Sequence, residues 1–405
     1  MNDYRALLAA PRFRGLLLAL LCNGLGTWCV IASLPLLVAD RFGTGMALVL
    51  SLGLRILPKA LLAPVAEMLL RRFGAARIAS NALVPLAVLT ALLPLCHSLW
   101  LLQALVAATG TLDVFITPGL LSLRGPVMPA GLEMVGNTLC SAANRAAQVM
   151  GPALGGLAVM IGFGPAFLGF AILIAISALP IARLHLPFAG SGTRHHRGML
   201  RDAVWILRTD RQVLGLTVAA LTYMVLLGGM RPFLFWANHD WYGGGELAWT
   251  GLLSAQGIGA LCGAIVSALF ARRLMGFISP YRLAMITGVL EGSMHLLLLT
   301  AQTSLQATTI VLLAGVPEIV STAAWFTTLQ SRLSASRQAQ FFAFLTPLWD
   351  LCFALGVASA ALHAEGWMSL SGYWALVSLI ATLPLIPLLL QRAPDRGVHA
   401  PTTVP

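Results

Sequence analysis

Charged residues are scarce in this sequence. They make up only 10% of the 405 residues, whereas 58% are hydrophobic and the mean hydropathy is +0.86. Soluble domains usually have about a quarter of their residues charged, so this composition excludes a water-soluble fold. The formal net charge of +11 would suggest a nucleic-acid partner in a soluble protein, but here the basic residues lie in loops between apolar segments. We therefore expect no nucleic-acid binding.

The sequence also lacks the short motifs of common catalytic sites. It contains no phosphate-binding loop ending in Gly-Lys-Ser/Thr, no nucleophile elbow and no His-Glu-xx-His segment, so we expect neither an enzyme nor an ATP-driven pump. Its six cysteines lie mostly inside apolar segments, and His295 is interpreted as structural. We therefore expect no disulfide, metal site or cofactor. No small-residue cleavage site follows the first apolar segment, which we predict to be retained.

Long apolar segments fill most of the chain. A helix needs about 20 apolar residues to cross the hydrocarbon core of a bilayer. Segments of that length predict about twelve membrane-spanning helices, six on each side of a polar break. They are 13–38, 45–70, 78–96, 99–121, 134–161 and 165–184, then 213–235, 248–271, 283–301, 305–329, 340–362 and 368–390.

The polar break divides the chain into two expected six-helix bundles. We expect an N-terminal bundle at 1–186, a central loop at 187–212, a C-terminal bundle at 213–391 and a tail at 392–405. The central loop starts with glycines and continues as a basic amphipathic stretch around Trp205, which is typical of a segment lying on a membrane surface.

Arginine in the loops predicts the orientation, because basic residues are retained on the cytoplasmic side. If the N-terminus is inside, nearly all loop arginines are cytoplasmic and only Arg41 is outside. Both termini and the central loop are thus expected in the cytoplasm. The arginines on that side are Arg5, Arg12, Arg14, Arg71, Arg72, Arg77, Arg124, Arg183, Arg194, Arg197, Arg201, Arg208, Arg211, Arg272, Arg273, Arg282, Arg332, Arg337, Arg392 and Arg396.

The fifth apolar segment carries polar and small residues at helical spacing. Spacings of three and four place its polar side chains and Gly151 on one stripe, which is costly to expose to lipid. The polar members are Asn137, Ser141, Asn144, Arg145 and Gln148. A Gly-Pro-Ala-Leu-Gly-Gly string follows, made of Gly151, Pro152, Ala153, Leu154, Gly155 and Gly156. Its glycines allow another helix to approach closely, and the eighth segment has a similar pair, Gly259 and Gly263.

These motifs resemble the major facilitator superfamily, in particular its bacterial exporter branch with the macrolide-efflux proteins and the enterobactin exporter. The resemblance runs from about residue 13 to 390, and its most specific match is GPALGG, which is similar to the antiporter motif of the superfamily. PRFRGLLLALLCNGLGTW, LRILPKALLAPVA and GLLSAQGIGALCG support it. The resemblance implies an all-α membrane protein of the major facilitator fold, a secondary transporter in the bacterial inner membrane that works as a monomer.

The chain departs from that family pattern at several charged positions. Thr27 and Thr117 occupy places where the branch usually has acidic residues. In the loop after the second helix, where the family has a Gly-xxx-Asp-Arg-xx-Arg-Arg motif, Arg72 and Phe73 are retained. The motif's glycine, aspartate and last two arginines are replaced by Glu67, Arg71, Ala75 and Ala76. The conformational latch that this motif provides in the family is therefore expected to be altered.

Several charged residues lie inside the apolar segments. Each costs about 3 kcal/mol or more at mid-bilayer, so it must be paired, hydrated or functional. The cations are Arg55, Lys59, Arg145 and Arg231, and the carboxylates are Asp113, Glu291, Glu318 and Asp350. Asp113 and Glu318 follow similar glycine-led strings in the fourth and tenth segments, which indicates matching places in the two bundles.

Two interpretations of these charges are open. Asp113 neutralises Lys59 or Arg145 as a structural ion pair, or Asp113 and Glu318 carry protons. We expect Glu291 to matter less and Arg231 to extend toward the membrane surface.

The resemblance to the exporter branch and these charged residues together favour a proton-driven exporter that works by alternating access. Arg55, Lys59, Arg145, Asn144 and Gln148 are the expected substrate-binding residues. Their positive charge favours a siderophore or a similar anionic metabolite as the cargo. The alternatives are a drug or macrolide efflux pump and, from another class, a membrane sensor or scaffold that transports nothing.

Overall fold

The computed structural model describes residues 2–128, 132–184 and 199–390. Within these ranges all regular structure is helical. Residues 187–198 of the expected central loop and the expected tail at 392–405 lie outside the described part, as do the side chains of Arg71, Arg272 and Arg273.

Each of the twelve predicted segments corresponds to a helix or to a helix with a short extension. The N-terminal half contains α1 (Asn2–Ala9), α2 (Pro11–Phe42), α3 (Met46–Phe73), α4 (Ala75–Leu92), η1 (Leu93–Leu95), α5 (Leu99–Ser122), α6 (Arg124–Val127), α7 (Glu133–Ile161) and α8 (Phe163–Ala182). The C-terminal half contains α9 (Met199–Thr209), α10 (Arg211–Asp240), α11 (Glu246–Phe277), α12 (Pro280–Leu296), η2 (Leu297–Thr300), α13 (Ser304–Arg332), α14 (Ala335–Ser359), α15 (Ala361–Ala364), α16 (Leu370–Thr382) and α17 (Leu385–Leu390).

In the described part, 11 helical segments are long and apolar enough to cross a membrane. The twelfth, α7, is 29 residues long but carries the polar stripe that lowers its hydropathy. It packs along α2 of the same half and along α11 of the other half. The prediction of an all-α membrane protein with about twelve spans is confirmed.

Helix boundaries follow local chemistry. Gly74 (φ +88°) and Gly162 (φ +89°) adopt the left-handed backbone that separates α3 from α4 and α7 from α8. A side chain at either position would be strained, so glycine permits these abrupt reversals. In the C-terminal half, the Asp210 carboxylate caps α10 by accepting hydrogen bonds from the backbone N–H groups of Gln212 and Val213.

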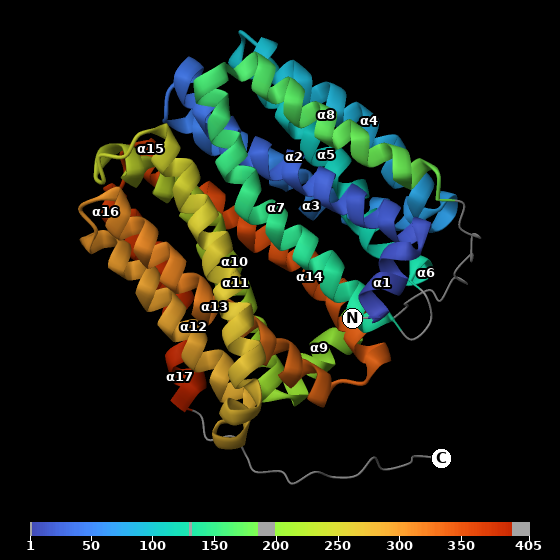
Figure 1. The fold of residues 1–405 in the computed structure, drawn as a ribbon. Helices are drawn as coiled ribbons and strands as arrows, with labels where there is room; N and C mark the ends of the chain where they lie inside the picture. The colour runs from blue at the N-terminus through green and yellow to red at the C-terminus, as the bar shows by residue number, and fades with distance from the viewer. Residues whose placement is uncertain (1, 129–131, 185–198, 391–405) are drawn as a thin grey trace.

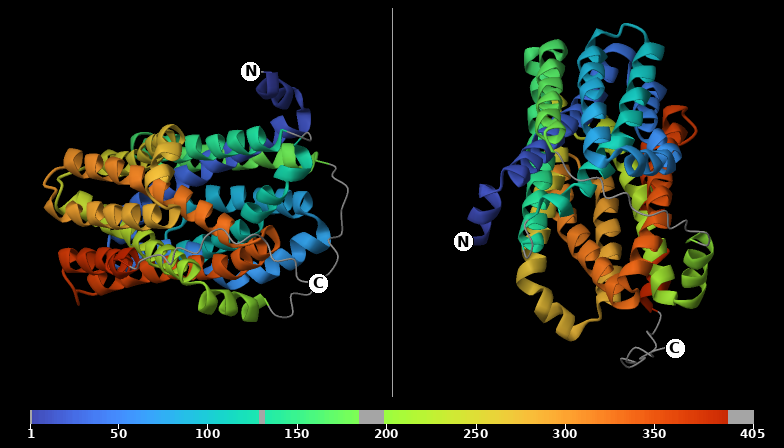
Figure 2. Two further views of the ribbon diagram at one scale, coloured as in Figure 1. Left: turned by 90° about the horizontal axis from the view of Figure 1, so that it is seen from below. Right: turned by 90° about the vertical axis from the view of Figure 1, so that its right-hand side faces the viewer.

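The helices pack as two groups that follow the order of the chain (Figure 1). In the first, α2 packs on α7 and α8, α4 on α5 and α8, and α3 on α5; in the second, α10 packs on α14 and α16, α12 on α13 and α16, and α11 on α13. The main contacts between the halves are α7 with α11 and α3 with α14. Figure 2 shows the long helices running side by side between the two ends of the molecule.

Small residues set these close approaches. A Cβ at Gly155 would lie 2.8 Å from the Cys29 carbonyl oxygen of α2, and the Ser33 hydroxyl donates a 2.8 Å hydrogen bond to the Gly155 carbonyl. Gly259 and Gly263 face α13 rather than α7, next to the backbone of Leu312 and Val316. The contact of α7 with α11 uses other glycines, Gly156 against Thr250 and Gly257 against Gln148 and Val149.

The buried cores show where the halves meet. One core contains residues of α2, α3, α10 and α11 and is therefore shared by both halves. It lies toward the end of the molecule that holds the α2–α3 and α10–α11 loops, which we call the opposite end. Two other cores each belong to one half, one packed on α1, α4 and α6 and the other on α9, α12 and α17. They lie toward the end with α1, α6 and α9, which we call the basic end (Figure 1).

Two tryptophans hold the halves together at the opposite end. The Trp236 indole of α10 donates a 2.6 Å hydrogen bond to the Thr44 carbonyl oxygen, and the Trp249 indole of α11 donates one of 2.9 Å to the Ala32 carbonyl oxygen. The molecule is thus closed at the opposite end, while each half has its own core at the basic end.

Candidate functional site

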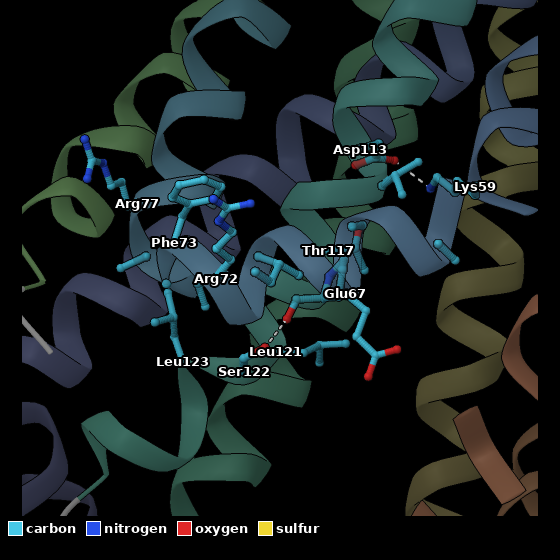
Figure 3. Close-up of a pocket in the computed structure, with 18 of the residues that line it drawn as sticks. Lys59, Glu67, Arg72, Phe73, Arg77, Asp113, Thr117, Leu121, Ser122 and Leu123 are labelled. Atoms are coloured by element: carbon cyan, nitrogen blue, oxygen red, sulfur yellow. Dashed lines mark hydrogen bonds and ion pairs between the residues drawn. The ribbon is translucent and has the colours of Figure 1, made fainter. Parts of the chain in front are cut away.

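A cavity of about 1030 Å³ opens toward the basic end; it is lined mostly by the N-terminal half, and the C-terminal half contributes Thr346 and Asp350 of α14. Its walls come from α3, the start of α4, α5 and α14 (Figure 3). The lining is mostly apolar, with three basic and three acidic side chains among the described residues. These are Lys59, Arg72, Arg77, Glu67, Asp113 and Asp350. The charges of the lining therefore balance, and a positive excess has to come from residues beyond the cavity wall.

An ion pair lies at the inner end of this cavity. Lys59 Nζ of α3 is 2.6 Å from Asp113 Oδ2 of α5, and their side chains are 30% and 8% exposed. Figure 3 shows the two groups facing each other, with Thr117 one turn further along α5 beside the carboxylate. Gly110 permits this contact, because it lies directly against the Arg55 backbone and brings α5 close to α3. The expected pairing of Asp113 with Lys59 is thus present, whereas Arg145 lies in another part of the molecule.

Arg55 lies one turn beyond Lys59, deeper in the protein. It is within electrostatic range of Asp113, so this one carboxylate has two cationic neighbours on α3. Its Nη1 atom is buried and has no hydrogen-bond partner among the described residues. A buried guanidinium nitrogen without an acceptor costs free energy, which is lowered when an anion or water reaches it.

Arg231 of α10 points into the protein, contrary to our expectation that it extends toward the membrane surface. Its guanidinium carbon lies 5.7 Å from the centre of the Trp28 ring and 5.3 Å from that of Phe353. Trp28 belongs to the N-terminal half and Phe353 to the C-terminal half, so Arg231 spans the interface by cation–π contacts. It is also within electrostatic range of Arg55, and the two positive charges repel each other.

Asp350 of α14 lines the cavity from the C-terminal half. It is within electrostatic range of both Lys59 and Asp113, which belong to the other half. From the sequence, Asp350 was only one of several intramembrane acids. Its side of α14 could not be inferred, because that helix is apolar over most of its surface.

A second polar group lies between α7 and the C-terminal half. Arg145 Nη1 donates a 2.7 Å hydrogen bond to Gln148 Oε1 and is within electrostatic range of Glu318 on α13. Glu318 in turn neighbours Gln256 of α11 and Tyr223 of α10. This group therefore joins the two halves, since Arg145 belongs to the first and Glu318 to the second.

Glu291 belongs to the same group, and the expectation that it matters less for transport stays a prediction. It is 4% exposed, its Oε1 atom has no hydrogen-bond partner among the described residues, and it lies within electrostatic range of Glu318 and Tyr223. Tyr223 was missed altogether. Tyrosines of membrane proteins favour the interfaces, so its position in the middle of α10 was the available signal.

The structure thus divides the predicted site residues between two places. Lys59 and Asp113 line the cavity, Arg55 adjoins them, and Arg145, Gln148 and Glu318 meet elsewhere. Asn144 has an exposed side chain on α7 and does not line the cavity. His295 bonds through Nδ1 to the Glu291 carbonyl oxygen at 2.9 Å, which agrees with a structural role.

A helical bundle in two halves, closed at one end and with a cavity that carries charged side chains open at the other, is the architecture of a membrane transporter. The Major Facilitator Superfamily model matches residues 16–357. The chain belongs to this superfamily, and it is a transporter of a small molecule.

Solved structures agree on the fold. The chain is similar to the POT family transporter PepTSo (TM-score 0.75, 11% identity, 94% of this chain and 97% of that one) and to the nucleoside transporter NupG (0.71, 11%, 93% and 97%). It is also similar to the human organic anion transporter MFSD10 (TETRAN), with a TM-score of 0.67, 16% identity and coverage of 94% and 99%. No curated protein matches the sequence. Identities this low support the fold and leave the substrate open.

Proposed function

We propose that this protein is a proton-coupled exporter of a small organic anion, such as a siderophore, in the bacterial inner membrane. The arginine-rich loops support the orientation, because basic residues are retained on the cytoplasmic side. With the basic end in the cytoplasm, the cavity takes up cargo from inside the cell and releases it after the halves rock apart at the opposite end. The outward direction rests on the Gly-Pro string of α7, which resembles the antiporter motif of the superfamily.

The observation that supports an anionic cargo is the excess of cations at the deep end of the cavity. Arg55, Lys59 and Arg231 lie in range of one another or of Asp113, and among the described residues Asp113 and Asp350 are the carboxylates that offset them. Within the described part of the chain Arg55 Nη1 has no acceptor, and the Arg231 guanidinium lies against the rings of Trp28 and Phe353. A carboxylate, catecholate or hydroxamate in this place would supply the missing negative charge and acceptors.

Proton coupling is supported by carboxylates that sit next to cations in both halves. Asp113 adjoins Lys59, and Glu318 adjoins Arg145. Protonation of either acid would release its cation, and at Asp113 the two states would differ in the charge that the cavity offers to the cargo.

The test is export from cells carrying Lys59→Ala, Arg55→Ala or Arg231→Ala, measured for an anionic siderophore and for a cationic dye. Arg282→Ala, an exposed arginine at the basic end, is the matched control. We expect each of the three substitutions to lower siderophore export at least tenfold, and the control to leave it unchanged. Unaffected siderophore secretion, or loss of dye export in its place, would contradict the proposal.

The second candidate is an efflux pump for drugs or macrolides. It is favoured by the apolar part of the cavity wall, which includes Leu70, Phe73, Val114 and Leu121. Such a pump would depend on those side chains more than on Arg55 and Arg231. Export of a neutral macrolide that survives Arg55→Ala but falls with Val114→Asp would support it.

A further inference from the structure

The charged side chains inside the membrane-spanning helices form two groups of opposite sign. With every side chain ionised, the described residues at the deep end of the cavity include one cation more than carboxylates. The group between α7 and the C-terminal half includes one carboxylate more than cations. The members of the first, the cationic group, are Arg55, Lys59, Arg231, Asp113 and Asp350, and those of the second, the acidic group, are Arg145, Glu318 and Glu291.

The acidic group contains a carboxylate oxygen for which the described residues supply no donor. Glu318 adjoins Arg145, so this arginine can neutralise one of the two carboxylates. Glu291 is 4% exposed, lies within electrostatic range of Glu318, and its Oε1 atom has no hydrogen-bond partner in the described part of the chain. A buried oxygen without a donor costs free energy, which a proton or a cation at this place lowers. Glu318 and Arg145 are only half-buried, so the group is still accessible.

The polar side chains around the two carboxylates are suited to an ammonium group. Tyr223 of α10 and Gln256 of α11 place neutral polar groups beside Glu318. On α12, His295 bonds through Nδ1 to the backbone carbonyl of Glu291. The helices α16 and α17, which pack on α12, contain no charged residue. An ammonium donates three hydrogen bonds and accepts none, so it fits a place with several acceptors and one negative charge in excess.

The two groups are separated by about 10 Å along the helices. Arg231 and Tyr223 lie eight residues apart on α10, which is about 12 Å at ~1.5 Å per residue. On α7, Gly151 packs against Trp28, the ring that contacts Arg231. Arg145 is six residues nearer the basic end than Gly151, or about 9 Å. A single small organic molecule is long enough to reach both groups.

We propose that the cargo is amphoteric and carries a protonated amine in addition to its anionic group. The amine binds at Glu318 and Glu291. The anionic group binds deeper in the protein, at Arg55 and Arg231. This inference rests on the function proposed above and narrows its cargo to molecules whose two charges are about 10 Å apart.

The direction of proton movement agrees with export. When the amine arrives from the cytoplasm, the protonated member of the acidic pair loses its proton to the cytoplasm, and a carboxylate–ammonium pair forms. The ammonium keeps its own protons, so charge and protons balance. After the opposite end opens, a proton from outside binds the carboxylate and the ammonium leaves with the cargo. Each cycle thus moves a proton inward and a cargo molecule outward.

The experiment compares two probes that differ only in the amine. A dihydroxybenzoyl-lysine has a carboxylate, a catechol ring and a side-chain ammonium, and acetylation of the side-chain nitrogen removes the positive charge. Isothermal titration calorimetry measures both affinities for the purified protein in detergent at neutral pH. Glu318→Gln and Glu291→Gln remove the proposed carboxylates, whereas Glu318→Asp keeps the charge. Glu246→Gln, an exposed acid at the opposite end, is the matched control.

We expect the wild-type protein to bind the amine probe about tenfold more tightly than the acetylated probe, as one charge-assisted hydrogen bond would give. Glu318→Gln and Glu291→Gln should each remove most of this advantage. Glu318→Asp should retain part of it, and Glu246→Gln all of it. Equal affinities of the two probes for the wild-type protein would overturn the proposal and assign the acidic pair to a proton alone. An advantage that survives both glutamine substitutions would overturn it as well.

Arg55→Ala separates this result from the fate of the proposed function. If neither probe binds, or if Arg55→Ala leaves both affinities unchanged, the anionic cargo of the proposed function is wrong. If Arg55→Ala weakens both probes but acetylation makes no difference, only the amine site is wrong.

Discussion

Asp113 has two cations on α3 within range, and this arrangement determines what a substitution at either end of the ion pair does. Lys59 is partly exposed to the cavity, whereas Asp113 is buried. Loss of Lys59 leaves Asp113 with Arg55 as a partner. Loss of Asp113 leaves both cations, with Arg231 nearby, facing Asp350 alone.

We therefore predict that Asp113→Asn destabilises the protein more than Lys59→Met does. Leaving buried charge without compensation costs about 3 kcal/mol, and Arg55 offsets part of that cost when Lys59 is removed. Thermal unfolding in detergent, followed by tryptophan fluorescence, measures the difference. Asp240→Asn, an exposed carboxylate that pairs with His239, is the control and should leave Tm unchanged. Equal losses in the two variants would show that Arg55 does not compensate.

The carboxylates also predict the transport phenotype. Asp113→Asn and Glu318→Gln should stop export against a concentration gradient but retain downhill exchange, because a neutral amide neither takes up nor releases a proton. Glu291→Gln should share this phenotype if Glu291 and Glu318 act as one unit. Vesicles with an imposed proton gradient measure both activities, and Glu246→Gln at the opposite end is the control. Normal coupling in both single variants would remove Asp113 and Glu318 from the mechanism.

Sequence reasoning found some of these residues and missed others for one physical reason. Counting along the segments places Lys59 and Asp113 at similar depths, so their pairing could be anticipated. Counting gives the depth of a residue but not the rotation of its helix about the helix axis. A helix that is apolar all round has no polar face that would show which side points away from the bundle. On that account the burial of Glu291 was not anticipated, and the direction of Arg231, which the structure turns inward, was predicted wrongly.

At the scale of helices, the glycine string of α7 has two faces with different partners. α2 packs against Gly151 and Gly155, and α11 of the other half packs against Gly156. The sequence identified these glycines as packing positions but not their partners, and it did not indicate that Gly259 and Gly263 serve α13. A Gly-xxx-Gly spacing reveals that some helix comes close, whereas the identity of that helix depends on the arrangement of the whole bundle.

Gly155→Val should therefore disrupt the α2–α7 contact. Its Cβ would lie 2.8 Å from the Cys29 carbonyl oxygen and 3.0 Å from Ala32 Cβ, so α2 would have to move. Overpacking of this kind usually costs about 1–3 kcal/mol. Gly169→Val on α8 is the matched control, because that glycine is exposed and has nothing within 4 Å of its Cβ position. We expect lower Tm and lower transport in the first variant only; equal effects would assign the loss to backbone flexibility.

For the whole molecule, the arginine-rich loops predict the orientation in the membrane. A phosphatase that is active only in the periplasm should be inactive when fused after Ser191 and active when fused near Gly244. Ser191 lies in the central loop, which its basic residues are expected to keep in the cytoplasm. Fusion after His97, in the loop before α5, is a second periplasmic position and should also be active. The reverse pattern would overturn the topology and, with it, the direction in which the cavity opens.

The state of the molecule depends on how firmly the opposite end is closed. Trp236 and Trp249 each donate a hydrogen bond from the C-terminal half to a backbone carbonyl of the N-terminal half. Trp374 donates a similar bond of 2.7 Å to the His295 carbonyl oxygen, but both partners belong to the C-terminal half. The three indoles thus make comparable bonds, and only the first two oppose separation of the halves.

The double variant Trp236→Phe/Trp249→Phe should therefore shift the protein toward the state that is open at the opposite end. Each lost bond is worth about 1 kcal/mol, so the open-to-closed ratio there should rise at least tenfold. Spin labels at Gly45 and Gly245, where a Cβ meets open space, measure the widening. Trp374→Phe removes an equivalent bond within one half and should leave that distance unchanged. If Trp374→Phe widens the end as much as the double variant does, closure depends on the internal packing of the C-terminal half and not on the two bonds between the halves.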